Sequence, residues 1–344
     1  MIAVVSTDRG IPLYGPSGAS AHLRHVTNAL RARGDVNVFV PTESDGRGHA
    51  GAAVGANITV VPTRNWPRGL RSWGRRWDAA HIWRAAAGAS WAWERAAAGI
   101  DAGARFCGPR ILELNAPAEE AGHVGRMAAG AERRNLTTAT RVVAVSSWLA
   151  RWAVERGAKP ERVRHVPNGS ALTGPGNREA GRARWDLSGL VVVLLGAHRP
   201  WHGAKHLPAL LAALPEAKAV VIGGGAVPID HPRVRHLPHL EGAALADALS
   251  AADVGLAPYD GAPPWLSPLK LADYLAVGLP VVARDVGDAA HLLRDAGQTM
   301  PDLDPATWAE AVRALSRRTP RPRPRPWATV ADEALGGIDL PKCA

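Results

Sequence analysis

The fold of this chain is best read from SPLKLADYLAVGLPVVARDVG, residues 267–287, where a helical pattern runs directly into PVVA (280–283). PVVA is a short run of apolar residues, which is the pattern of a strand buried on both faces. Strands of this kind form parallel sheets that are covered by helices on both sides. The stretch therefore predicts an α/β domain.

The same alternation fills the rest of the chain. In the second half, further buried runs are LVVVLLG (190–196), AVVIGGG (219–225) and VGLAP (254–258). In the first half, IAVVST (2–7) leads through a turn-rich loop to a helical segment, 21–34, and then to VNVFV (36–40). Later strand candidates are ITVVP, RILELN, RVVAVS and VRHVPNG. Two Rossmann-like, doubly wound domains in series are the predicted architecture.

A chain of 344 residues is long enough for two α/β domains of ordinary size. We expect an N-terminal domain at residues 1–169, a C-terminal domain at 170–318 and a further segment at 319–344. This segment begins with TPRPRPRP (319–326), whose alternating prolines remove amide donors and exclude a helix. It reads as a stiff connector to a last short helix, WATVADEAL (327–335).

The formal net charge of +10 indicates an anionic partner, for which nucleotide phosphates, nucleic acid and a membrane surface all qualify. The arginines are spread over the whole chain and no nucleic-acid-binding motif is present, so we expect no nucleic-acid partner. The two cysteines cannot form a disulfide framework. No apolar run is long enough to span a bilayer, and no leader pattern is seen. The sequence predicts a cytoplasmic protein, peripheral at most.

A first candidate site lies at the start of the helix in 267–287. Ser267 is a suitable N-cap, and the free amides of Leu269 and Lys270 would then point out of the helix beside a cationic side chain. This arrangement favours a diphosphate, and Asp273, one turn further, could accept hydrogen bonds from ribose hydroxyls. The spacing fits an ordinary capped helix with a solvated lysine and aspartate equally well.

A second candidate site follows the strand 190–196. Gly196 opens a loop that carries His198, Arg199, His202 and Lys205, at the strand end where doubly wound sheets bind ligands. Its cations suit a phosphate. The histidine spacing also invites a metal interpretation, but the intervening proline and glycine break any helix that would align the rings. We expect no metal here.

A third, weaker candidate is GPSGAS (15–20), a glycine loop between the first strand and the first helix. It has neither the dinucleotide-binding spacing nor the P-loop lysine. A plain turn between strand and helix is the simpler interpretation.

Taken in order, five motifs resemble family 4 of the retaining glycosyltransferases. They are the opening segment 6–40, ELNAPAEEA (113–121), VVAVSSWLARWAVERGAKPERVRHVPNG (142–169), LLGAHRPWHGAKHL (194–207) and SPLKLADYLAVGLPVV (267–282). WATVADEAL resembles the family's closing helix, which returns to the N-terminal domain. The resemblance implies a GT-B fold with two domains facing a cleft. It also implies a nucleoside-diphospho-sugar donor held by the C-terminal domain, an acceptor held by the N-terminal domain, and no metal or other cofactor.

The resemblance also assigns roles to residues. The family's Arg/Lys pair for the diphosphate falls on Ala197 and His202, so the catalytic cations would be Arg199 and His202, or Lys205 and Lys270. Of the family's two acids, the second falls on Asp273.

The first acid of the family falls on Trp265, and Asp260 is the candidate substitute for it as the acid that touches the donor sugar. Gly18 and Ala19 match the N-terminal loop that approaches the phosphate and the acceptor.

Two further features are candidates on the acceptor side. Glu119, Glu120 and His123 follow a predicted strand end, and one of them could orient the acceptor hydroxyl; surface charges on a helix explain them equally well. Residues 64–95 hold six tryptophans and seven arginines against two acids. We expect the tryptophans to pack inside the N-terminal domain, with an interfacial segment at a membrane as the alternative.

The sequence therefore predicts hexosyl transfer from a nucleotide sugar with retention of configuration. The acceptor is left open between a glycan precursor, a lipid-linked intermediate and a small metabolite. The alternatives are a degenerate relative that binds nucleotide sugar without transfer, which the loss of the acid at Trp265 favours, and an epimerase or phosphorylase on the same fold.

Overall fold

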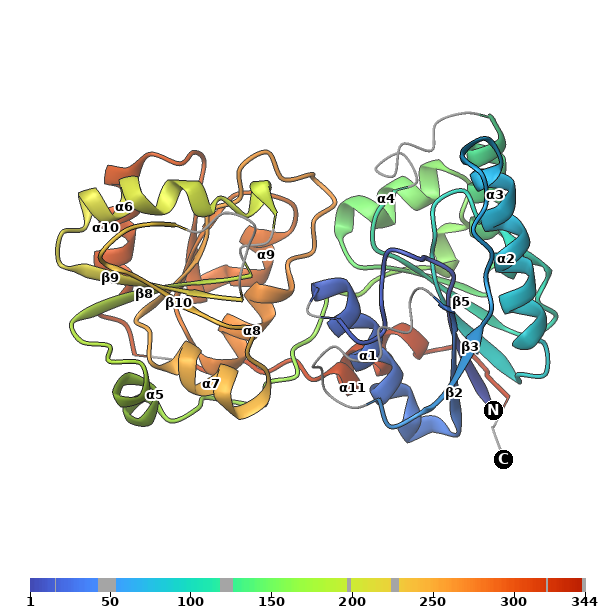
Figure 1. Cartoon of the computed structure of the whole chain (residues 1–344), viewed down its shortest axis with the longest axis horizontal. Helices are drawn as coiled ribbons and strands as arrows, with labels where there is room; N and C mark the ends of the chain where they lie inside the picture. The colour runs from blue at the N-terminus through green and yellow to red at the C-terminus, as the bar shows by residue number, and fades with distance from the viewer. Residues whose placement is uncertain are drawn as a thin grey trace. The chain divides into compact units, whose positions relative to one another are not determined.

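A computed structural model describes residues 1–15, 17–42, 54–117, 126–196, 199–223, 229–319 and 321–341 of the chain. Contacts divide the chain into an N-terminal unit, Met1–Pro167 with Trp327–Ala344, and a C-terminal unit, Asn168–Pro326. The expected boundary lay after residue 169, with 319–344 as a separate segment; in the structure, the connector belongs to the C-terminal unit and the last helix to the N-terminal unit. Figure 1 shows the helices and strands of both units.

The N-terminal unit is built on a parallel sheet of seven strands in the order β3-β2-β1-β4-β5-β6-β7. The strands are β1 (Ile2–Ser6), β2 (Val36–Pro41), β3 (Asn57–Val61), β4 (Trp91–Arg95), β5 (Arg110–Leu114), β6 (Arg141–Ala144) and β7 (Val163–His165). The helices are α1 (Gly18–Leu30), α2 (Arg71–Ala85), α3 (Arg126–Thr138), α4 (Ser147–Glu155) and α11 (Trp327–Leu335). Helix α2 covers one face, where Ile82 and Trp83 pack on Val5 and Phe39.

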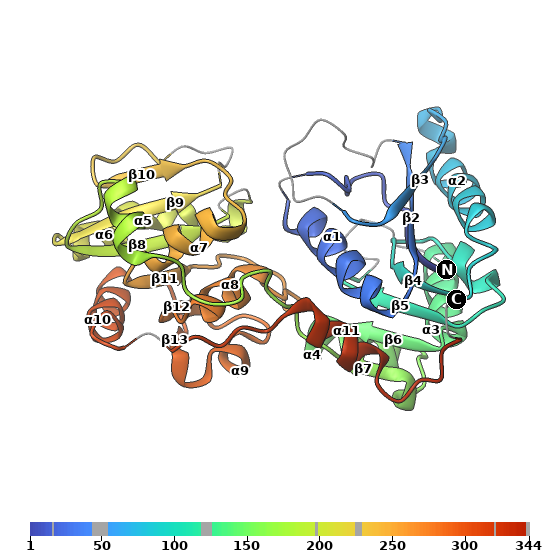
Figure 2. The same ribbon diagram turned by 90° about the horizontal axis from the view of Figure 1, so that it is seen from below.

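Helices α1 and α11 lie side by side (Figure 2). Trp327, the first residue of α11, stacks on His25 at 5.6 Å between ring centroids and meets His22 edge-on at 4.9 Å. His22 in turn contacts Glu113 of β5 through a buried 2.6 Å hydrogen bond. The last helix is thus fixed to the first one, so residues about 300 positions apart in the sequence share one core.

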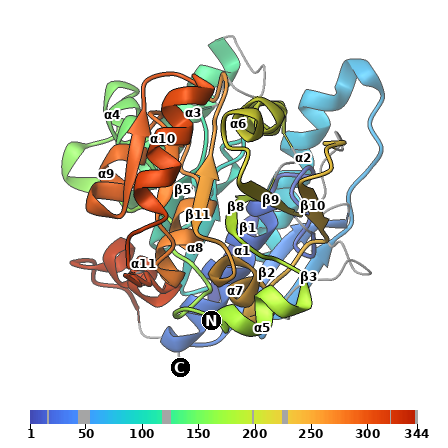
Figure 3. The ribbon, with the colours of Figure 1, turned by 90° about the vertical axis from the view of Figure 1, so that its left-hand side faces the viewer.

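The C-terminal unit contains a six-stranded parallel sheet in the order β10-β9-β8-β11-β12-β13. The strands are β8 (Leu190–Leu195), β9 (Ala217–Ile222), β10 (Val234–Leu237), β11 (Val254–Ala257), β12 (Val281–Arg284) and β13 (Gly297–Met300). The helices are α5 (Arg178–Arg184), α6 (Leu207–Ala213), α7 (Gly242–Ser250), α8 (Leu269–Val277), α9 (Ala289–Leu293) and α10 (Pro305–Leu315). Helices α6 and α10 lie beside each other on one face, and α7, α8 and α9 cover the other (Figure 3).

The chain forms two α/β domains with parallel sheets, as predicted. Three strands had no counterpart in the sequence analysis: β4, β10 and β13. Strand β4 has the sequence WAWER and lies at the centre of its sheet, between β1 and β5. Its tryptophans and charges mask the aliphatic pattern by which buried strands are recognised.

The connector after α10, predicted to be a stiff connector, also forms hydrogen bonds to α8. The amides of Arg321 and Arg323 donate to the carbonyls of Gly278 and Leu275 at the end of α8. Because prolines alternate with arginines, every second amide remains available, and the extended segment donates these amides to carbonyls at the helix end. None of the helices in the described ranges is long and apolar enough to cross a bilayer.

Candidate functional site

The candidate site lies where the order in which strands are added to the C-terminal sheet reverses. From β8 the chain builds outward through β9 and β10, and then returns to place β11 on the other side of β8. The carboxyl ends of β8 and β11 therefore form the topological switch point, where loops diverge and leave a crevice for ligands. The loop after β8 and the loop after β11 both leave the sheet here.

These two loops are joined by their backbones. The amide of Asp260 donates to the carbonyl of Trp201 at 3.0 Å. Gly203 has a left-handed backbone with φ of 74°, and a Cβ atom there would lie 1.6 Å from the carbonyl oxygen of Pro258. Only glycine allows this approach, so the loops form one continuous rim above the switch point.

Helix α8 is fixed over the same point by Tyr274. Its hydroxyl lies 3.2 Å from the carbonyl oxygens of Val193 in β8 and Leu256 in β11. It also accepts a 2.8 Å hydrogen bond from the amide of Leu195. The ring packs over Gly255, which has no side chain to obstruct it. One turn before Tyr274, Lys270 is therefore held in a defined position.

Lys270 is the most unusual side chain of the site. It is only 7 % exposed, and its Nζ atom has no hydrogen-bond partner in the described part of the chain. The ammonium group lies 5.1 Å from the centre of the Tyr259 ring, a cation–π contact that replaces part of the lost hydration. Burial lowers the pKa of Lys270 to about 7. A buried cation without a counter-charge is costly unless a ligand supplies the charge.

The loop after β8 carries Arg199 and His202, and His202 contacts the same tyrosine. The His202 ring meets the Tyr259 ring edge-on at 6.3 Å. Arg199 is exposed, stacks over Trp201 at 5.4 Å, and forms no ion pair with the described residues. The loop after β8 and the first turn of α8 thus bring two of the predicted catalytic cations, His202 and Lys270, to the ring of Tyr259 in the loop after β11, and Arg199 lies on the same loop as His202.

Asp273 lies one turn into α8 and contacts the segment that enters the C-terminal unit. Its Oδ1 atom accepts a 2.6 Å hydrogen bond from the Ser170 hydroxyl, which in turn accepts one from the amide of Leu172. Burial raises the pKa of Asp273 to about 7, although the Ser170 hydrogen bond opposes this. The carboxyl group can therefore change its charge near neutral pH.

Ser267 is not the N-cap of α8, as the sequence analysis expected. The helix begins at Leu269 with Pro268 as its N-cap, and no side chain caps it among the described residues. The Ser267 hydroxyl instead accepts a hydrogen bond from the Asn168 side-chain amide at 3.1 Å. Proline at the cap position displaces the serine by one residue. The first-turn amides of α8 are left without a side-chain partner, as a phosphate site requires.

Asp260 and Lys205 pair with each other. Asp260 Oδ2 lies 2.7 Å from Lys205 Nζ and 2.9 Å from His206 Nε2, and these hydrogen bonds lower the pKa of the carboxyl group. Gly196, with φ of 68°, turns the chain at the end of β8. Trp265 lies partly buried in the loop before α8.

The remaining predicted residues are in the N-terminal unit. Gly18 and Ala19 are the first residues of α1 rather than part of the loop, because the Ser17 hydroxyl caps the helix at the amide of Ser20. Glu119, Glu120 and His123 lie outside the described residues, as do Ala197 and His198 of the C-terminal unit.

Sequence reasoning missed Tyr259, Tyr274, Ser170 and Asn168. A signal existed for the first two, since the chain has only three tyrosines and two of them are here. In the structure, Tyr274 uses its hydroxyl to contact β8 and β11, and Tyr259 uses its ring to contact Lys270. No local pattern marks Ser170 or Asn168, because their partners are about 100 residues away.

Comparison with known families gives the same division of the chain. Residues 17–169 match the family described as glycosyl transferase 4-like domain, and residues 190–318 match glycosyl transferases group 1. The chain is a member of the GT-B glycosyltransferase superfamily. No curated protein sequence matches this glycosyltransferase significantly.

Solved structures share the fold. Sucrose-phosphate synthase from Thermosynechococcus elongatus is 17 % identical with a TM-score of 0.70, over 97 % of this chain and 92 % of its own. HepE from Anabaena, solved with UDP and glucose, is 18 % identical with a TM-score of 0.66, over 97 % and 93 %. WaaG, from lipopolysaccharide biosynthesis, is 16 % identical with a TM-score of 0.64, over 98 % and 100 %. The predicted GT-B fold is thus confirmed.

Proposed function

We propose that this glycosyltransferase moves a hexosyl unit from a UDP-sugar to an acceptor hydroxyl with retention of configuration, as a family 4 enzyme. The superfamily supports the class of reaction. The choice of uridine and of a hexose rests on HepE, which shares the fold and was solved with UDP and glucose and with UDP-glucose.

The observation that carries the proposal is the buried ammonium group of Lys270 at the switch point, which has no hydrogen-bond partner among the residues that the structure describes. A diphosphate would supply the missing counter-charge. Arg199 and His202 would bind it from the loop after β8, and the uncapped amides of α8 would contact it from below. Each charge-assisted hydrogen bond to the phosphates contributes roughly 1.5–3 kcal/mol.

Asp273 would accept hydrogen bonds from the ribose hydroxyls, since it sits one turn behind Lys270 on the same helix. The proposed site uses side-chain cations and helix amides, so transfer would proceed without a metal ion. Asp260 would serve the donor sugar only if substrate binding released it from Lys205 and His206.

In the proposed reaction, the bond between the anomeric carbon and the diphosphate oxygen breaks as the acceptor oxygen bonds to the same face of the sugar. The acceptor proton passes to the departing phosphate. Negative charge grows on that phosphate in the transition state, and preorganised cations stabilise it there more than in the ground state. Lys270, Arg199 and His202 would therefore act on the leaving group, and no covalent nucleophile is required.

Thermal denaturation with UDP, GDP, ADP and dTDP, each with EDTA or with magnesium, tests the donor site. At 100 times its dissociation constant a ligand stabilises the folded state by about 2.7 kcal/mol, a rise of several degrees in Tm. Of the four diphosphates, we expect only UDP to raise Tm by this amount, and the rise should be equal with EDTA and with magnesium. A rise only with magnesium would contradict metal-free binding, and no rise with any diphosphate would contradict the site.

Product analysis separates transfer from its alternatives. With UDP-glucose, a transferase releases UDP in proportion to a glycosylated product whose anomeric proton coupling shows the donor's configuration. A degenerate relative binds UDP and releases none with any acceptor. An epimerase or phosphorylase turns over without an acceptor, the latter only with inorganic phosphate.

A further inference from the structure

A cluster of large apolar side chains lies exposed on the N-terminal unit. Leu70, Trp73 and Trp77 are 51 %, 68 % and 54 % exposed. Leu70 ends a short 3-10 helix (Arg68–Leu70) and the two tryptophans are in α2. The spacing i, i+3, i+7 places them on one side. In the described ranges only Met127 and Val154 are other large apolar residues with comparable exposure.

The other tryptophans of this region are accounted for by packing. Trp83, Trp91 and Trp93 are buried, as the sequence analysis expected. Trp66 donates its indole N–H to Asp78 and its ring lies against Gly74. Trp73 and Trp77 are thus the exceptions. Exposing two neighbouring indole rings to water is unfavourable. Such an apolar patch indicates a surface that binds a partner molecule or a membrane.

The charge around this cluster is uniformly positive. Arg68 and Arg71 flank Leu70, and Arg84 follows Trp77 by two helical turns on the same face. All three are exposed, and none has an ion-pair partner within the described ranges. Between residues 54 and 93 the only acid is Asp78, which is buried and paired with Arg9.

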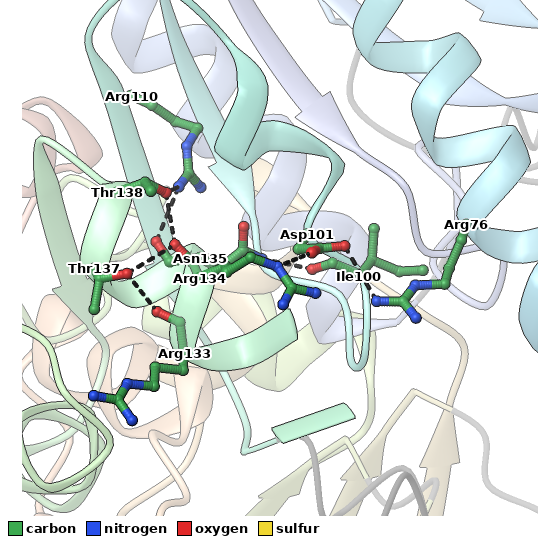
Figure 4. A network of polar contacts seen from close by, with 9 residues as sticks. All are labelled: Arg76, Ile100, Asp101, Arg110, Arg133, Arg134, Asn135, Thr137 and Thr138. Atoms are coloured by element: carbon green, nitrogen blue, oxygen red, sulfur yellow. Dashed lines mark hydrogen bonds and ion pairs between the residues drawn. The ribbon is translucent and has the colours of Figure 1, made fainter. Parts of the chain in front are cut away.

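Arg76 of the same helix differs from these three arginines, because it has an ion-pair partner within the protein. It forms an ion pair with Asp101, which also binds Arg134 of α3 (Figure 4). Helix α2 has no side-chain N-cap in the described part of the chain, so its first-turn amides add positive potential at the same end as Leu70.

We propose that Leu70, Trp73 and Trp77 with Arg68, Arg71 and Arg84, here called the tryptophan–arginine face, bind the surface of a bilayer rich in anionic phospholipid. Indole rings prefer the boundary between headgroups and acyl chains, where their apolar area is buried and the N–H stays hydrated. Arginines extend to lipid phosphates while their stems cover apolar surface. This face is independent of the nucleotide site, so it adds a membrane partner to the proposed function.

Sedimentation of the full-length protein with vesicles tests the proposal. We expect the protein to sediment with vesicles of phosphatidylglycerol and phosphatidylcholine in equal parts, and to remain in solution with phosphatidylcholine alone. Binding should fall at least tenfold between 50 mM and 500 mM salt, because exposed charges are screened. The double variants Trp73→Ser/Trp77→Ser and Arg68→Glu/Arg71→Glu should each lower vesicle affinity at least tenfold.

The matched controls lie on α3 of the same unit. Met127→Ser removes an exposed apolar side chain of similar exposure, 63 %, and Arg133→Glu reverses an exposed arginine. Both should bind vesicles as the parent does. Hydrogen exchange in β1, β4 and β5 of every variant shows that the N-terminal unit is folded. UDP binding measured on the same variants separates a failure here from a failure of the donor site.

Three results would overturn the proposal. The parent could fail to sediment with anionic vesicles, or the tryptophan variant could bind them as tightly as the parent. The parent could also be a dimer that Trp73→Ser/Trp77→Ser dissociates and that ignores vesicles, in which case the face joins two copies of the chain.

Discussion

At the scale of single residues, Lys270 distinguishes a binding site from a structural helix. Its ammonium is buried against Tyr259 with no counter-charge among the described residues, which costs stability in the free protein. We expect Lys270→Met to weaken UDP binding at least tenfold, and to raise the free energy of unfolding by about 2 kcal/mol at pH 6. Calorimetric titration and urea denaturation measure the two quantities. A variant that loses stability and keeps UDP affinity would show that Lys270 only fills space.

Because the pKa of Lys270 is lowered, its effect on the free energy of unfolding depends on pH. Between pH 7 and about 10.5 the unfolded chain binds a proton that the folded protein does not, so this residue makes stability rise with pH. The gain from Lys270→Met should therefore be largest below pH 7 and should shrink toward pH 10. Urea denaturation of parent and variant across this range checks the trend.

UDP affinity should follow the protonation of the same group. With a pKa of about 7, Lys270 loses its charge as pH rises, while the terminal phosphate of UDP is already ionised. We expect the affinity of the parent to fall from pH 7 to pH 9, by up to tenfold per unit, and the affinity of Lys270→Met to stay flat. A parent whose affinity does not change over this range would contradict the assignment.

At the scale of elements, the site depends on the contact between the loops after β8 and β11. Gly203 and Gly261 both have left-handed backbones, with φ of 74° and 67°, but only Gly203 faces a neighbour, the carbonyl of Pro258. Alanine costs about 1–2 kcal/mol at either position for the backbone alone.

Gly203→Ala should lower the free energy of unfolding by about 1–3 kcal/mol more than Gly261→Ala does, because the added methyl group pushes the loops apart. UDP affinity should fall with it, and Gly261→Ala is the matched control. The idea that this contact shapes the site would be wrong if the two variants had equal stability and equal UDP affinity.

At the scale of the whole molecule, the last helix completes the first domain. Trp327 is 6 % exposed and packs on His22 and His25 of α1. We expect Trp327→Ala to destabilise the N-terminal unit by about 3–5 kcal/mol, the usual cost of removing a buried tryptophan. Hydrogen exchange should then quicken in α1 and α11, while UDP binding to the C-terminal unit is retained. Faster exchange in β8 and β11 and not in α1 would contradict the prediction, because those strands belong to the C-terminal unit.

The site was predictable in part. A helix beginning near residues 267–268 and a loop after Gly196 were both predicted, and the structure has α8 from Leu269 and a loop after β8, because strand ends and helix starts carry local signals. Their meeting around Tyr259 was not, since it depends on which strands are neighbours in the sheet. Ser267 was misassigned as a cap because Pro268 satisfies the same local pattern one residue later.

What the sequence alone determined is the class of the fold, and it also predicted a phosphate ligand. Buried apolar runs alternating with helices require parallel sheets, and an excess of cations at strand ends favours phosphate. The tertiary structure decided which polar groups are satisfied. It paired Lys205 with Asp260 and Asp273 with Ser170, and in the described part of the chain it left Lys270 without a counter-charge. It also buried Trp83 and exposed Trp73 on one helix. Burial and pairing depend on neighbours distant in the chain, and a linear pattern carries no record of them.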